Sequence, residues 1–199
     1  MRILTATLAG LVLLLAGCAA APVATDPPQP AATASTPQGD PATEQFLARY
    51  GLDGLTPQQI VETLDAATTD RDQGPVGSVR PSEVVLSDGE QEVALPLPDD
   101  VFYLAFAPYR DRTHDCFNHN LATCSGELSG EVVKVTVVDD AGATLVDTEV
   151  TTHANGFAGV WLPRDIAATL TVSHAGESVT APIATGANDP TCLTTLKLG

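Results

Sequence analysis

Two segments of this 199-residue sequence gather the residue types that could bind a metal ion or exchange electrons. One lies in the middle of the chain, within residues 113–128, and the other lies near the C-terminus. Thiolate sulfur selects soft ions such as Cu(I), and imidazole nitrogen is a compatible ligand. The combination therefore fits a copper site. The candidate metal ligands are Cys116, Cys124 and Cys192, with His114 and His119 as additional candidates.

The number of cysteines leaves two interpretations open. Three cysteines remain once the N-terminal Cys18 is set aside. In an oxidising compartment, an odd number gives either one disulfide with a leftover thiol or a site that keeps its thiols for a metal. The spacing Cys116-x7-Cys124 matches no zinc finger or ribbon, and no Cys-x-x-Cys motif indicates thiol–disulfide exchange. Residue types and spacing alone do not decide between a structural disulfide and a metal site.

Charged neighbours bear on how reactive these thiols are. Asp115 and Glu127 lie close to the cysteines in the sequence. Carboxylates near a thiol disfavour the thiolate and raise the thiol pKa above its usual value of about 8.5. We therefore expect no special reactivity without metal, and we expect copper to displace the thiol proton when it binds. The other histidines, His153 and His174, lie beside predicted turns and are interpreted as structural.

Several separated motifs raise the specificity of the copper interpretation. They are Cys-Phe-Asn-His at 116–119, Cys-Ser-Gly-Glu-Leu at 124–128, Ala-Asn-Gly-Phe at 154–157, Trp-Leu-Pro at 161–163 and Thr-Cys-Leu-Thr-Thr-Leu at 191–196. Together, and in this order, they resemble the CueP family of periplasmic copper-binding proteins. The resemblance covers roughly residues 44–198.

The resemblance implies a copper-resistance protein that works outside the cytoplasm. Such a protein holds copper through three cysteines, which here are Cys116, Cys124 and Cys192. It also implies reduction of Cu(II) to Cu(I) by the thiols and transfer of copper to a cuproprotein acceptor, which makes the chain a metal-binding protein more than an enzyme. The alternative is a structural or ligand-binding β-sandwich lipoprotein, stapled by one disulfide and carrying one spare thiol.

The N-terminus reads as an export signal. An apolar run from Ile3 to Leu15 follows Met1-Arg2, and it is too short for a membrane-spanning helix, which needs about 20 residues. Leu15-Ala16-Gly17-Cys18 has the form of a lipoprotein cleavage site, so Cys18 is expected to become a lipidated N-terminus. Residues 1–18 are thus predicted to be a signal peptide, and the Pro/Ala/Thr-rich residues 19–41 are predicted to form a disordered tether. The expected location is extracytoplasmic, anchored by lipid to the periplasmic side of the cell membrane.

Residues 42–75 are predicted to form a helical hairpin. In the first helix Phe46 and Tyr50 share a face, and Gly51 occupies the position after the C-cap. In the second helix, Thr56 to Gln59 combine an N-cap, a proline at the first helical position and a capping-box glutamine. Each helix is too short to be stable alone. The hairpin must therefore pack on the rest of the chain or on a second copy, which would give a homodimer.

Residues 76–199 carry the cysteine site and are predicted to form a β domain, because the hydrophobic period changes from helical to two. Eight or so short strands at this spacing indicate an antiparallel sandwich. The fold class is therefore α+β, mainly β, with an N-terminal helical hairpin before a β-sandwich-like domain. The expected strands and hairpins are a hairpin of Val84–Ser87 and Glu92–Leu95 across a two-residue Asp-Gly turn, a buried strand at 101–107, a hairpin of 132–138 and 144–151, a strand at 157–162, a hairpin of 169–173 and 178–183, and a last strand at 191–198.

Composition excludes one large class of partner. The chain has 25 acidic and 9 basic residues and a net charge of −16, so its surface repels the phosphates of nucleic acids. No Walker loop or dinucleotide-binding glycine motif is present. The three-cysteine hypothesis also makes a geometric demand: Cys192 on the last strand must approach the loop that carries Cys116 and Cys124.

Overall fold

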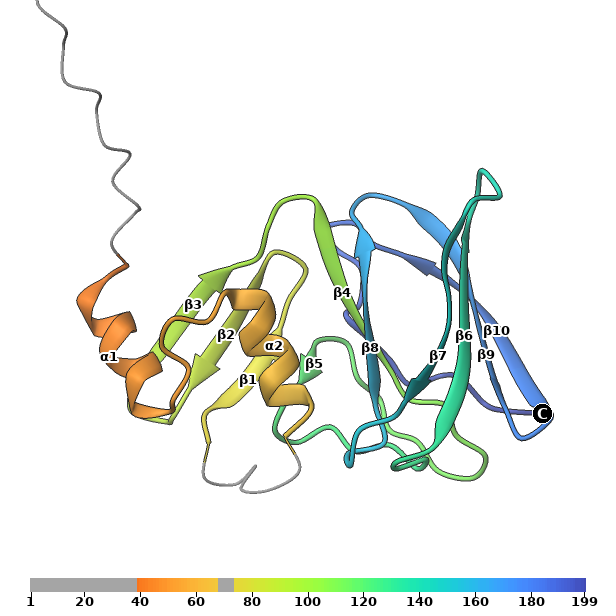
Figure 1. The fold of residues 1–199 in the computed structure, drawn as a ribbon, viewed down its shortest axis with the longest axis horizontal. Helices are drawn as coiled ribbons and strands as arrows, with labels where there is room; N and C mark the ends of the chain where they lie inside the picture. Colours follow the sequence, from red (N-terminus) through yellow and green to blue (C-terminus); the bar gives the residue numbers. More distant parts are fainter. Residues whose placement is uncertain (1–38, 68–73) are drawn as a thin grey trace, which may run out of the picture. The chain divides into compact units, whose positions relative to one another are not determined.

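The computed structural model describes residues 39–67 and 74–199 (Figure 1). The predicted signal peptide with Cys18, and nearly all of the predicted tether, lie outside these ranges. Within them, no helix is long and apolar enough to cross a membrane.

The two helices form where the sequence predicts them. Helix α1 (Pro41–Arg49) has Tyr50 as its C-cap. Gly51 follows with a φ of 67°, a left-handed conformation that glycine adopts without strain. Helix α2 (Pro57–Asp65) begins at Thr56, whose side chain accepts a hydrogen bond from the Gln59 backbone in a complete capping box. The helices pack on the first sheet of the chain, and the hydroxyl of Tyr50 reaches Asp88 at 3.0 Å.

In the described part of the chain, eleven strands form three sheets, so the fold is mainly β as predicted. The first sheet has the order β3-β2-β1-β5, made of β3 (Glu92–Pro96), β2 (Glu83–Ser87), β1 (Val76–Val79) and β5 (His119–Asn120). The second has the order β10-β9-β6-β7, made of β10 (Glu177–Ala184), β9 (Ala167–His174), β6 (Val132–Asp139) and β7 (Thr144–Thr151). The third has the order β11-β4-β8, made of β11 (Cys192–Leu193), β4 (Val101–Phe106) and β8 (Ala158–Pro163). All neighbours pair antiparallel except β11 and β4, which are parallel.

Strand β4 lies between the two four-stranded sheets and divides the interior into two cores (Figure 1). Successive side chains of a strand point to opposite faces. Phe102, Leu104 and Phe106 pack into the core shared with β6 and β9. Tyr103 and Ala105 point into the other core, together with the helices and the first sheet. Burial on both faces explains why this strand reads in the sequence as a continuous apolar run.

One predicted turn is wrong in its length. The hairpin of β2 and β3 exists, but Ser87 pairs with Glu92, so four residues connect the strands instead of two. The carboxylate of Asp88 accepts hydrogen bonds from the backbone N–H groups of Glu90 and Gln91, at 3.0 and 2.8 Å, which stabilises the longer loop. The last predicted strand is also shorter than expected, because only β11 and a single bridge from Lys197 to Tyr109 form.

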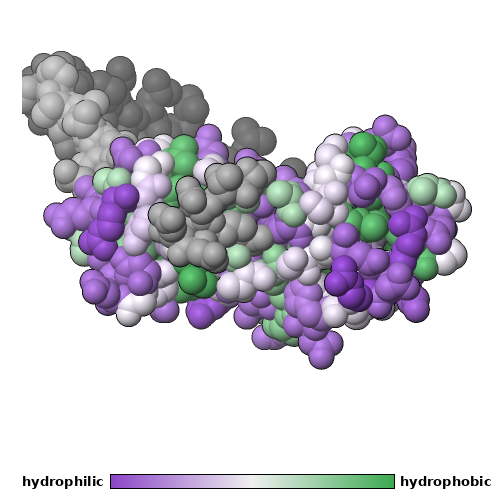
Figure 2. Space-filling model, turned by 90° about the horizontal axis from the view of Figure 1, so that it is seen from below, coloured by the Kyte–Doolittle hydropathy of each residue, from purple (hydrophilic) through white to green (hydrophobic). Residues whose placement is uncertain are grey.

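The surface follows from the acidic composition. Hydrophilic side chains dominate the face shown in Figure 2, and hydrophobic residues form only small patches there. Among the described residues, the large hydrophobic side chains that are exposed are Val76, Phe117 and Val132. Phe117 is 57% exposed and directly follows the candidate ligand Cys116.

Candidate metal centre

Two short strands bring the candidate ligands together. Strand β5 places His119 opposite Val79 of β1, and strand β11 places Cys192 beside Ala105 of β4. Thr191 connects the two strands, because its hydroxyl accepts from the His119 backbone N–H at 3.0 Å and donates to the Val79 carbonyl at 2.6 Å. This threonine is fully buried and helps to fix the site.

The three sulfur atoms lie together, as the geometric requirement demands. Cys116 and Cys192 form a disulfide with a Cα–Cα distance of 5.6 Å across a sequence separation of 76 residues. The sulfur of Cys124 lies 3.4 Å from the sulfur of Cys116. The molecule therefore holds a disulfide with a third cysteine against it, and reduction of that disulfide would expose three thiols within one small volume.

Both candidate histidines border this sulfur cluster. Nδ1 of the fully buried His119 lies 3.8 Å from the sulfur of Cys192. The donor atoms of His119, Cys124 and Cys192 all lie within 4.8 Å of one another, and the same is true of His114, Cys116 and Cys124. Sulfur and imidazole donors at this spacing have the chemistry that a soft or borderline metal ion requires. The ligand role of each residue remains a prediction.

A buried carboxylate that the sequence reasoning missed orients His119. One oxygen of Asp65 lies 2.9 Å from His119 Nε2 and accepts from the side-chain amide of Asn155 at 3.1 Å. Its other oxygen accepts from the hydroxyl of Tyr103 at 2.6 Å. Asp65 and His119 are both fully buried. Because Nε2 is committed to the carboxylate, Nδ1 faces the sulfur atoms, an arrangement typical of metal-binding histidines.

A signal for Asp65 was present in the sequence. It lies four residues after Val61, so it falls on the apolar stripe of α2, where a charged residue is out of place. A buried charge needs a partner, and such a residue is a candidate for a functional network. Tyr103 and Asn155 carried no comparable signal, because one continues an apolar strand and the other begins a turn.

The pKa values in this cluster shift through mutual contacts. Burial opposes the charged imidazolium, but the Asp65 carboxylate and Cys124 outweigh it and raise the pKa of His119 to about 9. Burial likewise opposes the Cys124 thiolate, but hydrogen bonds from His119, from His114 and from the Asn120 backbone lower the pKa of Cys124 to about 7. Desolvation would raise the pKa of Asp65, yet His119 and Tyr103 hold that pKa below its usual range.

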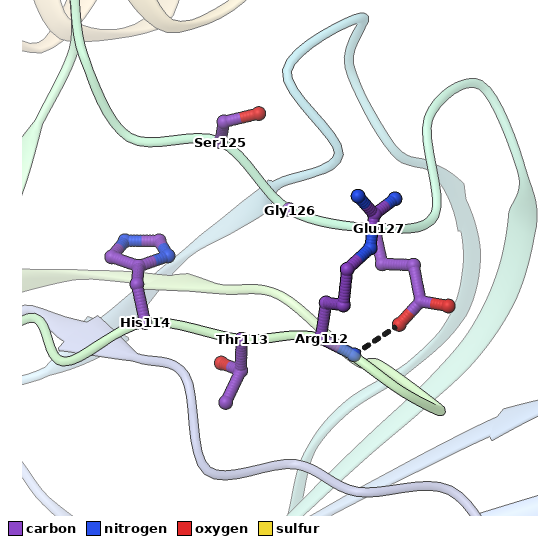
Figure 3. Close-up of a pocket in the computed structure, with 6 residues that line it drawn as sticks. All are labelled: Arg112, Thr113, His114, Ser125, Gly126 and Glu127. Carbon is purple, nitrogen blue, oxygen red and sulfur yellow. Dashed lines mark hydrogen bonds between the residues drawn. The ribbon is translucent and has the colours of Figure 1, made fainter.

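The expectation of a raised thiol pKa is therefore wrong for Cys124. Glu127, one of the carboxylates on which it rested, is used elsewhere. Its side chain accepts three backbone hydrogen bonds, from Arg110, Asp111 and Arg112, at 2.9 to 3.0 Å. These backbone donors lower the pKa of Glu127 and tie down the loop beside the cluster (Figure 3). The groups that decide the thiol pKa are the histidines.

Two glycines let the loop that carries Cys124 approach the turn before β8. The backbone N–H of Gly126 donates to the Asn155 carbonyl at 2.5 Å. A Cβ atom at Gly126 would meet the carbonyl oxygen of Gly156, and Gly156 itself has a φ of 79°. This close packing joins the loop that carries Cys124 to the turn at Asn155 and Gly156. The ring of Phe157, which follows the turn, contacts both His114 and His119.

The fold and the cluster define a class of protein: a small β-rich protein with a cysteine and histidine centre suited to a soft metal. The sequence matches the family described as "Periplasmic copper-binding protein CueP" over residues 59–197. The chain therefore belongs to the CueP family. Family membership agrees with the predicted copper and with the predicted extracytoplasmic location.

A solved structure supports the same assignment. The chain is similar to the protein in "Crystal Structure of S.CueP", with 46% sequence identity and a TM-score of 0.78. The similarity covers 80% of this chain and 99% of that one. No curated protein matches the chain.

Proposed function

We propose that this protein binds copper outside the cytoplasm through Cys116, Cys124 and Cys192. The observation that carries the proposal is the contact of a disulfide with a third cysteine and a buried histidine. Thiolates are the preferred ligands of Cu(I), and the neutral imidazoles of His114 and His119 supply additional donors. Because His119 carries a raised pKa, copper binding to its Nδ1 releases a proton.

The same cysteines can supply electrons to Cu(II). Two Cu(II) ions and the thiols of Cys116 and Cys192 give two Cu(I) ions, one disulfide and two protons. The Cys116–Cys192 disulfide supports this step, because it is the bond that the reaction would form. Cys124 and the histidines then hold Cu(I) until it passes to an acceptor cuproprotein. A pocket of about 310 Å³, lined by Cys116, Cys124 and Phe117, supports such a transfer because it opens beside two of the sulfur atoms.

The binding step is tested with three variants, Cys116→Ser, Cys124→Ser and Cys192→Ser. A hydroxyl is a hard and weak donor, so each variant of the reduced protein is expected to lose Cu(I) affinity against a competing chelator. Ser125→Ala, next to Cys124, is the control and should retain the affinity. Three cysteine variants with unchanged affinity would refute the copper site and leave the disulfide as a structural staple.

The redox step needs a separate measurement. Fully reduced protein is mixed with Cu(II), and a chromogenic chelator binds the Cu(I) that forms. The mass of the protein is then measured by mass spectrometry. We expect two Cu(I) ions per chain and a mass decrease equal to two hydrogen atoms. Cys124→Ser keeps both partners of the disulfide and should still lose two hydrogen atoms, whereas the double variant Cys116→Ser and Cys192→Ser leaves Cys124 without a disulfide partner and should prevent the mass change. Cu(I) formation that is equally strong in the double variant would contradict the assignment.

We also propose that residues 1–18 direct export and that Cys18 carries the membrane anchor. The support is the Leu-Ala-Gly-Cys motif after a short apolar run. Cys18→Ser should abolish lipid attachment and leave copper binding unchanged, since the tether separates the two. Mass spectrometry of the exported wild-type protein measures whether its mature N-terminus carries lipid, and a mature chain without lipid would exclude the anchor.

A further inference from the structure

The two histidines occupy different environments around the sulfur atoms. His119 and Cys192 are buried, with 0% and 2% of their surface exposed. His114 and Cys116 are only partly buried. The pocket of about 310 Å³ is lined by His114, Cys116 and Cys124 and by neither member of the buried pair. The cluster therefore has an inner side and an outer side, and Cys124 belongs to both.

The inner side is already organised for a metal ion. Asp65 holds His119 through Nε2. The ring nitrogen that can bind an ion is therefore Nδ1, which lies 3.8 Å from the sulfur of Cys192. The backbone of Cys192 is also held, because its N–H donates to the Phe117 carbonyl at 3.1 Å. An ion on this side would be enclosed by the first core.

The outer side has its own nitrogen donor. The buried Nε2 atom of His114 makes no hydrogen bond to any of the described residues. A buried polar atom without a partner is costly, and a bound ion is one way to compensate it. Figure 3 shows the His114 ring turned toward Ser125 and Gly126 across a second open pocket of about 200 Å³. An ion bound by His114, Cys116 and Cys124 would stay accessible from solvent through the pocket of about 310 Å³ that these residues line.

We propose that the reduced cluster binds two Cu(I) ions at overlapping positions that share the Cys124 thiolate. The outer position consists of His114, Cys116 and Cys124, and the inner position consists of His119, Cys124 and Cys192. This inference rests on the proposed copper function and specifies its capacity. A thiolate sulfur has several lone pairs, and soft metal ions are commonly held in thiolate clusters.

Charge also favours a second ion. Three thiolates with one Cu(I) carry a net charge of −2, and with two Cu(I) the net charge is −1. The Asp65 carboxylate lies within the same network, and the whole chain carries −16, so the surroundings do not compensate the excess. Because uncompensated charge in a buried site is costly, the second ion stabilises the filled cluster.

The test is a Cu(I) titration of the fully reduced protein without oxygen, in competition with a chelator. The wild-type protein should bind two equivalents. His114→Ala and Cys116→Ser each remove a donor of the outer position only, so each should lose one equivalent and keep the other. His174→Ala, a histidine on β9, is the matched control and should bind two. Urea unfolding of every variant establishes whether it is folded. If one of the two outer variants, His114→Ala or Cys116→Ser, does not fold, the other one tests the outer position.

The outcomes separate this inference from the proposed function. The second Cu(I) position is overturned if the wild-type protein binds only one equivalent of Cu(I), or if both outer variants still bind two. Either result leaves the proposed copper binding intact. No bound Cu(I) in the wild-type protein overturns both. Cys124→Ser gives an independent check, because loss of a shared ligand should weaken both equivalents, whereas loss of only one would contradict the sharing.

Discussion

Replacing Asp65 with asparagine is expected to destabilise the metal-free protein by about 3 kcal/mol and to lower the pKa of His119. Asparagine has nearly the same shape as aspartate, so the change removes the negative charge without opening a cavity. The amide oxygen can still accept from His119 and Asn155, and the amide nitrogen then faces the oxygen of Tyr103. The network keeps its geometry but loses its charge.

The magnitude follows from the three hydrogen bonds that the carboxylate accepts. A hydrogen bond to a charged group contributes about 1.5–3 kcal/mol and a neutral one about 0.5–1.5 kcal/mol, so each bond loses roughly 1 kcal/mol. The total of about 3 kcal/mol agrees with the cost of about 3–5 kcal/mol for removing one partner of a buried ion pair. The Asp65 carboxylate is also a principal cause of the raised pKa of His119, which should therefore fall below about 9.

Two measurements on the disulfide-intact, metal-free protein test this reasoning. Urea unfolding gives the change in stability, and an NMR titration of the His119 ring gives its pKa. Tyr103→Phe is the control, because it removes one hydrogen bond to Asp65 and leaves the contact with His119. It should cost only about 1–2 kcal/mol and leave the pKa of His119 raised. A loss below 1 kcal/mol for Asp65→Asn, or an unchanged pKa of His119, would refute the assigned role.

Three further predictions concern the disulfide, the thiol and the loop. Reducing the Cys116–Cys192 disulfide should lower the free energy of unfolding by up to about 4.5 kcal/mol, because it closes a loop across 76 residues; equal urea midpoints with and without reductant would contradict this. Alkylation of Cys124 in the disulfide-intact protein should accelerate as pH rises through about 7, where its thiolate forms, and a midpoint near 9 would count against the histidine contacts. Gly126→Ala should cost about 1–3 kcal/mol, since its Cβ would overlap the Gly156 backbone, whereas Gly199→Ala, in open space, should be neutral in the same unfolding assay.

Local signals in the sequence were sufficient to find most elements. The capping box at Thr56 and the glycine at position 51 define both helices, and the alternation of apolar residues defines β6, β9 and β10. These signals act over a few residues, where backbone preferences decide the structure. Strands β1 and β5 were not predicted as strands, because four and two residues are too few to show a period.

The arrangement of the site depends on pairings that no local pattern encodes. The pairs β1 with β5 and β4 with β11 join segments far apart in the chain, and the second pair is parallel. The convergence of the cysteines was therefore predictable only through family resemblance. Even that resemblance did not reveal Asp65, because a supporting carboxylate acts through His119 and carries no ligand motif of its own.

The origin of the cluster in distant parts of the chain has a consequence for how the protein matures. Asp65 comes from α2, His119 from β5 and Cys192 from β11, close to the C-terminus. A chain that emerges from an export channel N-terminus first cannot complete this donor set until its last strand has arrived. Before then, Cys116 and Cys124 are the available pair among the three cysteines of the site, and they are only 8 residues apart.

Early oxidation therefore favours the wrong disulfide. Closing the short loop costs about 2 kcal/mol less chain entropy than closing the native one across 76 residues. The folded protein overrides this preference by pairing β11 with β4, which places Cys192 against Cys116. Correct maturation of the site thus requires either that folding precedes oxidation or that the cysteines exchange partners after export. In that exchange the Cys192 thiolate attacks the sulfur of Cys116 and Cys124 leaves as the thiolate.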